Sequence, residues 1–227
     1  MRVAVIEDEL RLAENIAASL RETAGFAVDV AHDGEEGLYL VTTNDYDALV
    51  LDLMLPRLSG IEVLTRMRNA GIRTPVLVLS ARDEMESVLG LLDRDADDYM
   101  TKPFDLRELR SRLRALIRRS QGHAVSKLVA GDIEMDTTQA TVRRAGIPVS
   151  LMPMEYKMLE YLLHRQGQVV SKNELLEHLY DFNWEKFSNV IEVYIAGLRK
   201  KIEGASDPRL IHTLRGHGYM LREEEPQ

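Results

Sequence analysis

The residues of this chain best suited to chemistry are charged or hydroxyl side chains placed directly after short apolar segments. Glu7 and Asp8 follow VAVI and Asp52 follows ALVL, while Ser80 follows VLVL and Lys102 follows DDYMT. Clustered carboxylates repel one another unless a cation neutralises them, and their oxygens suit Mg²⁺. A carboxylate in such a cluster can attack a phosphoryl donor, while a lysine and a hydroxyl bind the transferred group.

These residues lie within a regular alternation of short apolar strands and amphipathic helices. Strands are predicted at 3–6, 27–30, 48–53, 76–79 and 98–100, and helices at 11–23, 34–42, 61–69, 84–94 and 105–119. Strands that alternate with helices imply a parallel sheet covered on both faces. Five such units in about 120 residues are typical of a flavodoxin-like, doubly wound α/β domain. Ligands of such sheets bind beyond the carboxyl ends of the strands, where the polar residues are expected to converge.

The pattern changes near residue 120, which divides the chain into two expected domains. We expect the first domain at 1–119, a polar linker at 120–127 and the second domain at 128–224. Alternating strands over 128–149 precede three helices and a terminal hairpin, which we expect at 154–165, 173–180, 189–203 and 211–221. A capping box of Ser171 and Glu174 should start the second of these helices. The second domain is therefore predicted to be α+β.

Composition limits the class of protein and its partners. The chain has 227 residues and no cysteine, which excludes disulfide frameworks, thiolate metal sites and cysteine nucleophiles. Apolar runs stay well short of the roughly 20 residues that a membrane span needs, so we expect a cytoplasmic protein without membrane contact. The net charge is −8, so any binding to DNA has to come from a local basic patch.

The segments VAVIEDE, DALVLDLMLP, VLVLSAR and DDYMTKPF resemble the motifs of the CheY-like receiver family, in the same order. This resemblance implies that Asp52 accepts a phosphoryl group and that Mg²⁺, or Mn²⁺, is the cofactor. The implied metal ligands are Asp8, Asp52, Glu7 and the backbone carbonyl of Met54. Of the acidic pair, Asp8 is favoured over Glu7 as the direct ligand.

The same resemblance assigns the residues that bind and sense the phosphoryl group. Ser80 is the switch hydroxyl, Tyr99 the switch aromatic and Lys102 the residue that pairs with the phosphate, and the bond between Lys102 and Pro103 is expected to be cis. Phosphorylation should draw Ser80 inward and let Tyr99 follow. Two receivers should then pair through the face made by the fourth helix, fifth strand and fifth helix. The charged positions that match this interface are Asp97, Asp98, Glu108, Arg112 and Arg119.

The segments LEYLLHRQGQVVSKNELLEHLY, NVIEVYIAGLRKKI and PRLIHTLRGHGYML resemble the winged-helix effector domain of the OmpR/PhoB family. In that family the third helix enters the major groove of DNA and the hairpin reaches the minor groove. The residues thereby expected at the DNA are Asn189, Tyr194, Arg199, Lys200, Lys201 and Arg215. The basic run at 199–201 has a second interpretation, a charge bias that the helix dipole favours.

The chain departs from the family pattern at two places. Ala196 and Gly197 stand in the middle of the recognition helix, where basic residues are common, so base readout is expected to fall on Asn189, Tyr194 or Arg199. In the fourth helix, the sequence Glu-Ser-Val at 86–88 replaces the usual acidic and basic pair before valine. Glu108, the acidic residue of the fifth helix at the dimer interface, therefore lacks a basic partner in the usual place.

Together the two resemblances imply a two-component response regulator. A sensor histidine kinase would phosphorylate it, and the homodimer would bind tandem half-sites in promoter DNA. In relatives the loop at 181–188 contacts RNA polymerase or the DNA backbone. Enzymatic activity would be limited to self-phosphotransfer and slow hydrolysis of the aspartyl phosphate.

Three other classes of protein compete with the response regulator as interpretations of the sequence. An atypical regulator that binds DNA without phosphorylation stays open because of the unusual fourth helix. A phosphatase of the haloacid dehalogenase type needs a second acid two residues after its nucleophile, where Met54 stands. A pure phosphorelay carrier would have no use for residues 128–221.

Overall fold

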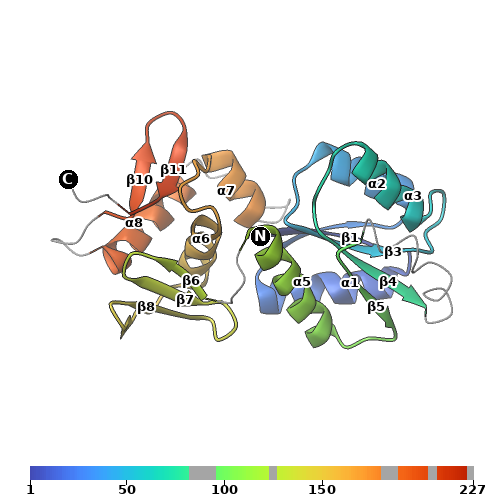
Figure 1. Cartoon of the computed structure of the whole chain (residues 1–227), viewed down its shortest axis with the longest axis horizontal. Coiled ribbons are helices and arrows are strands. Elements are labelled where there is room, and N and C mark those ends of the chain that lie inside the picture. The colour runs from blue at the N-terminus through green and yellow to red at the C-terminus, as the bar shows by residue number, and fades with distance from the viewer. Residues whose placement is uncertain (82–95, 123–126, 180–188, 204–208, 224–227) are drawn as a thin grey trace. The chain divides into compact units, whose positions relative to one another are not determined.

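The computed structural model describes residues 1–81, 96–122, 127–179, 189–203 and 209–223 (Figure 1). The chain forms two compact units, Met1–Ser120 and Gln121–Gln227. Three predicted features lie wholly or largely outside the described residues: the helix at 84–94, the linker at 120–127 and the loop at 181–188. Within the described ranges, no helix has the length and apolar character needed to cross a bilayer.

A five-stranded parallel sheet forms the centre of the first unit, in the order β2-β1-β3-β4-β5. Its strands are β1 (Arg2–Ile6), β2 (Ala27–Ala31), β3 (Ala48–Asp52), β4 (Val76–Ala81) and β5 (Asp98–Lys102). The helices are α1 (Leu10–Ser19), continued by the π-helical turn η1 (Leu20–Ala24), α2 (Gly34–Thr43), α3 (Gly60–Asn69) and α5 (Leu106–Ser120). In Figure 1, α2 and α3 cover one face of the sheet and α1 and α5 cover the other. The predicted flavodoxin-like α/β fold is confirmed.

The central strands β1, β3 and β4 are apolar along most of their length, as strands buried between two layers of helices usually are. Every residue of β1 and β3 is buried, and so are the first five residues of β4. The edge strand β5 buries one residue, Met100. Helix α5 closes its side of the sheet with buried residues at helical spacing, Leu109, Leu113 and Leu116. This packing leaves the last residues of the strands as the places where polar side chains can gather.

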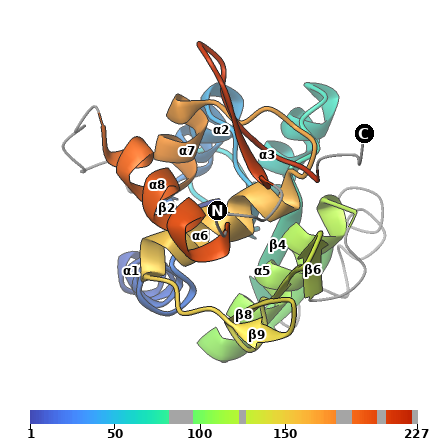
Figure 2. The same cartoon turned by 90° about the vertical axis from the view of Figure 1, so that its left-hand side faces the viewer.

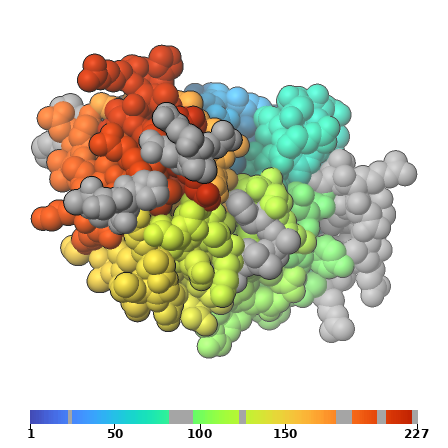
Figure 3. All heavy atoms as spheres, turned by 60° about the vertical axis from the view of Figure 1, so that its left-hand side comes forward, coloured from blue at the N-terminus to red at the C-terminus, as the bar shows by residue number. Residues whose placement is uncertain are grey.

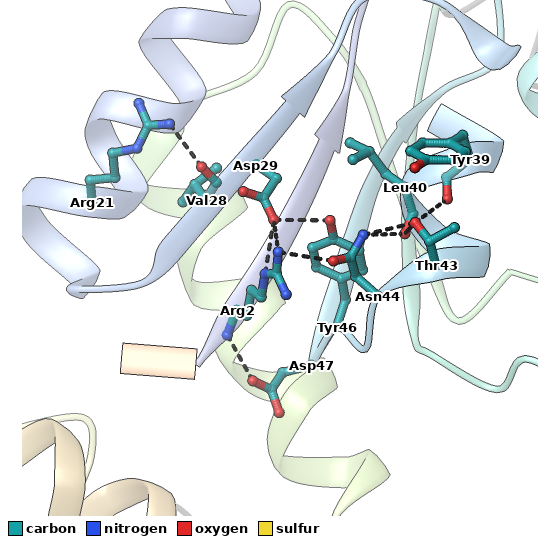
Figure 4. Close-up of polar contacts among 10 residues, drawn as sticks. All are labelled: Arg2, Arg21, Val28, Asp29, Tyr39, Leu40, Thr43, Asn44, Tyr46 and Asp47. Carbon is teal, nitrogen blue, oxygen red and sulfur yellow. Dashed lines mark hydrogen bonds and ion pairs between the residues drawn. The ribbon is translucent and has the colours of Figure 1, made fainter. Parts of the chain in front are cut away.

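At the amino ends of the strands, a buried arginine at the start of β1 stabilises the sheet (Figure 4). The backbone N–H of Arg2 donates to Asp47 Oδ2 at 2.7 Å, and Arg2 Nε donates to Asp29 Oδ2 at 2.8 Å. The hydroxyl of Tyr46 donates to the same Asp29 oxygen at 2.9 Å, and the guanidinium lies 5.0 Å from the Tyr46 ring centroid. Burial and the Asp29 charge raise the pKa of Tyr46. The network ties β1, β2 and the start of β3 together.

The second unit combines antiparallel strands with three helices. One sheet contains β6 (Lys127–Ala130), β7 (Ile133–Asp136), β8 (Thr141–Arg144) and β9 (Ile147–Pro148), and the helices are α6 (Pro153–His164), α7 (Lys172–Leu179) and α8 (Val190–Ile202). The predicted capping box of α7 is present, since Glu174 N donates to Ser171 Oγ and Ser171 N donates to Glu174 Oε2. The expected α+β winged-helix fold is confirmed.

The chain ends in the hairpin of β10 (Ile211–Leu214) and β11 (Gly218–Leu221). The hairpin projects away from the helices in Figure 2, and its surface (red) protrudes in Figure 3. Strand β11 also pairs with the segment before α7, because Val170 and Tyr219 exchange two backbone hydrogen bonds of 2.8 Å. Gly218 permits this pairing: its φ is 138°, and a Cβ there would lie 2.1 Å from Val170 O.

Candidate functional site

Three carboxylates meet at the carboxyl ends of two neighbouring strands. Glu7 and Asp8 follow β1, and Asp52 ends β3, which pairs with β1 in parallel register. Oxygens of the three side chains lie within 4.8 Å of one another. Glu7 and Asp52 are buried and Asp8 is exposed, so the cluster opens to solvent on the Asp8 side. The convergence expected from the sequence is therefore present.

Lys102, the last residue of β5, reaches across the sheet edge to two of these carboxylates. Its Nζ donates to Glu7 Oε1 at 2.9 Å and forms an ion pair with Asp52. The peptide bond from Lys102 to Pro103 is cis, as predicted. Ser80, near the end of the intervening strand β4, is fully buried, and its Oγ donates to the carbonyl oxygen of Ala81 at 3.1 Å. The structure thus brings four strand ends together around Asp52.

The three carboxylates of this cluster carry more negative charge than the single ammonium of Lys102 can neutralise. Burial raises the pKa of Glu7 to about 7, and the Asp52 charge acts in the same direction, while Lys102 opposes them. Burial lowers the pKa of Lys102, but its hydrogen bonds to Asp52 and Glu7 outweigh this and raise it. Glu7 Oε2 is buried and lies 2.9 Å from Lys102 Nζ, but it accepts no hydrogen bond from the described part of the chain. A set of oxygen donors with excess negative charge fits a hard divalent cation.

The loop after β3 fixes the orientation of the Asp52 carboxylate. The backbone N–H of Met54 donates to Asp52 Oδ1 at 3.0 Å, while the Met54 side chain is 64% exposed. Gly60, at the start of α3, was not singled out from the sequence. A Cβ at Gly60 would lie 2.0 Å from the carbonyl oxygen of Asp52, so only glycine lets α3 begin this close to the site. The sequence signal was the helix cap directly before it, in which Ser59 accepts from Glu62 N.

The residues expected at the dimer interface largely pair within one receiver. Arg68 Nη2 lies 3.0 Å from Asp97 Oδ2. Arg112 lies 3.0 Å from Asp98 and 2.8 Å from Glu108. Burial opposes but does not cancel the effect of these carboxylates, which raise the pKa of Arg112. Two further switch and interface residues, Tyr99 and Arg119, are exposed at the surface of the receiver unit. Their part in pairing stays a prediction.

The residues expected at DNA divide into two groups in the second unit. Arg199 Nη2 donates to Ile211 O at 2.7 Å and to Thr213 Oγ1 at 2.8 Å, so its guanidinium joins α8 to the hairpin. Lys201 Nζ donates to the buried Glu155 Oε2 at 2.6 Å, which joins α8 to α6. The outward-facing group contains Asn189, Lys200 and, in the hairpin turn, Arg215, all exposed, with Tyr194 partly exposed.

Both units match known protein families. Residues 3–114 match the family model described as response regulator receiver domain, and residues 146–221 match the one described as transcriptional regulatory protein, C terminal. The chain is 41% identical over 229 residues to response regulator MprA of Mycobacterium avium (strain 104), with 100% of both chains covered. It is 40% identical to response regulator MprA of Mycobacterium tuberculosis (strain H37Rv), covering 100% of this chain and 99% of the relative.

A solved structure resembles the first unit. The receiver domain of a Francisella response regulator is 41% identical, with a TM-score of 0.50, over 52% of this chain and 98% of that domain. The likeness extends over the part of the chain that carries the acidic cluster.

Proposed function

Because this chain belongs to the two-component response regulators of the OmpR/PhoB type, with a receiver and a DNA-binding domain, we propose that phosphorylation of Asp52 controls its binding to DNA. The observation that carries this proposal is the convergence of Glu7, Asp8 and Asp52 within 4.8 Å beside Lys102. A sensor histidine kinase supplies the phosphoryl group. The outcome is regulated transcription from promoters that carry the recognised half-sites.

Each side chain of the cluster has a separate role in phosphoryl transfer. A carboxylate oxygen of Asp52 bonds to phosphorus while the bond between phosphorus and the donor histidine nitrogen breaks. A Mg²⁺ ion held by Asp8, Asp52, Glu7 and the Met54 carbonyl would neutralise charge on the transferring group. Lys102, already paired with Asp52, turns its ammonium to a phosphoryl oxygen.

Ser80 and Tyr99 carry the signal away from the phosphoryl group. The buried Ser80 hydroxyl, which now donates to a neighbouring carbonyl, turns to a phosphoryl oxygen, and the exposed ring of Tyr99 moves into the space vacated. Receivers then pair through the face that carries the interface charges, which include Arg119. Two winged-helix domains are thereby presented to tandem half-sites about one helical turn apart.

One experiment tests the phosphoacceptor directly. Incubation of the full chain with acetyl phosphate and Mg²⁺ should add about 80 Da, the mass of one phosphoryl group, by intact mass spectrometry. Asp52→Ala should abolish the gain. Asp45→Ala, which removes an exposed acid outside the cluster, is the matched control and should keep it. A gain that persists in Asp52→Ala, or that never occurs in the wild-type protein, would contradict the proposal.

The second candidate is a regulator whose DNA binding does not depend on phosphorylation. It is favoured by the ion pairs of Asp97, Asp98, Glu108 and Arg112 within one receiver, because these charges need no second subunit for neutralisation. Sizing the phosphorylated and unphosphorylated chains and titrating each onto DNA separates the two candidates. A monomer that binds DNA equally well in both states would favour the second.

A further inference from the structure

The recognition helix α8 presents a narrow stripe that faces away from the rest of its unit. The exposed positions recur at intervals of four, three and four residues, which places them on one side of a helix with 3.6 residues per turn. They are Asn189, just before the helix, followed by Val193, Ala196 and Lys200; Lys201 is exposed as well, but its ammonium is bonded to Glu155. The opposite side carries the buried residues Ile191, Ile195, Leu198 and Ile202. The centre of the outward stripe is thus apolar, with Val193 66% exposed.

Gly197, in the middle of α8, faces Glu155 inside the unit and is not part of the outward stripe. A Cβ at Gly197 would lie 2.8 Å from Glu155 Oε1. Glu155 is buried and accepts hydrogen bonds from Met152 N at 2.7 Å and from Lys201 Nζ at 2.6 Å. The absence of a side chain at 197 therefore lets the Glu155 carboxylate approach the helix. Positions 193 and 196 are left to face a ligand.

The side chain that would compete for base readout is used inside the unit. The Arg199 guanidinium is held by Ile211 O and Thr213 Oγ1. An arginine fixed to the hairpin in this way cannot also make the bidentate contact with guanine that arginine makes in the major groove. Base readout is therefore left to the outward-facing groups, which are the stripe and the partly exposed Tyr194.

Val193 and Ala196 offer no hydrogen-bond donor or acceptor from their side chains. The apolar group that base pairs display in the major groove is the 5-methyl of thymine. Side chains three residues apart on a helix have Cβ atoms about 5–6 Å apart, and successive bases of one strand are about 3.4 Å apart. The two side chains can thus meet methyl groups one or two base steps apart. Resting on the proposed function, we infer that α8 recognises thymine methyl groups through Val193 and Ala196, with Asn189 and Lys200 supplying polar contacts at the ends.

The test removes methyl groups from DNA and leaves base pairing unchanged. The phosphorylated full chain first selects duplexes from a random pool, and the selected sequence is resynthesised with deoxyuridine replacing one thymine at a time. At one or two positions in each half-site, affinity measured by fluorescence anisotropy should fall about fourfold, as expected for one buried methyl-sized group. The other thymines should show no change.

A variant then assigns the effect to the stripe. Val193→Ala should bind the thymine duplex more weakly and lose the penalty for deoxyuridine at one position. Val129→Ala, which shortens an exposed valine of β6, is the matched control and should keep the penalty. Thermal unfolding verifies that both variants fold.

The outcomes separate this inference from the proposed function. Selected DNA that tolerates deoxyuridine at every thymine overturns the methyl readout and leaves DNA binding intact. A penalty that survives in Val193→Ala at every position also overturns it. A chain that enriches no sequence from the pool overturns the proposed function itself.

Discussion

Replacing Gly218 by alanine should break the pairing between the hairpin and the segment before α7. Gly218 has φ of 138°, a region in which other residues lose about 1–3 kcal/mol. The added Cβ would lie 2.1 Å from Val170 O and 2.8 Å from Ser171 Cα, and these backbone atoms cannot rotate away as a side chain could. The two hydrogen bonds between Val170 and Tyr219 would be lost, at about 1 kcal/mol each. The total loss should be about 3–5 kcal/mol, a large part of the stability of a small domain.

Urea unfolding of the full chain measures this loss. Hydrogen exchange of backbone N–H groups in the described part of the second unit, read by mass spectrometry along the urea series, reports on that unit, while phosphorylation of Asp52 by acetyl phosphate reports on an intact receiver. Gly216→Ala is the matched control: Gly216 has φ of 79°, and no described atom lies within 4 Å of its would-be Cβ. It should cost only about 1–2 kcal/mol. Equal losses in Gly216→Ala and Gly218→Ala would refute the steric argument.

Three further predictions follow from other contacts. Burial raises the pKa of Glu7 from 4.5 to about 7, so between these pH values the native state holds a proton that the unfolded chain has lost. The free energy of unfolding in Mg²⁺-free buffer should therefore fall as the pH rises from 4.5 to about 7. Urea titrations at several pH values measure this fall, which should be absent in Glu7→Gln. Arg2→Leu should destabilise the receiver by about 3 kcal/mol in chemical denaturation, since it leaves the Asp29 carboxylate without its cation, and adding Asp29→Leu should recover most of the loss. Arg199→Met should destabilise the second unit by about 1–2 kcal/mol through its lost bonds to Ile211 O, while the salt dependence of DNA binding should keep its slope, which loss of a phosphate contact would lower by about 1.

The sequence by itself determined the receiver fold and the polar cluster at its strand ends. The three central strands read as apolar runs with a polar residue at or just after the end, Lys102 ends the polar edge strand β5, and parallel strands place these ends along one edge. The convergence of Asp8, Asp52, Ser80 and Lys102 could therefore be predicted from order and position, while their roles came from the resemblance to the receiver family. The capping box at Ser171 could be predicted because it depends on residues close in the sequence.

Tertiary structure decided which side chains of the second unit face outward. Arg199 and Lys201 look alike in sequence to Lys200, yet their partners lie 12 and 46 residues away, in the hairpin and in α6. Gly197 stands where basic residues are common in the family, and only the fold shows that a Cβ there would lie 2.8 Å from Glu155 Oε1. Contacts between distant segments have no local sequence signal, because they depend on how helices and strands pack. For this reason the candidate phosphoacceptor could be predicted from the sequence, whereas the surface proposed to read DNA could be identified only from the fold.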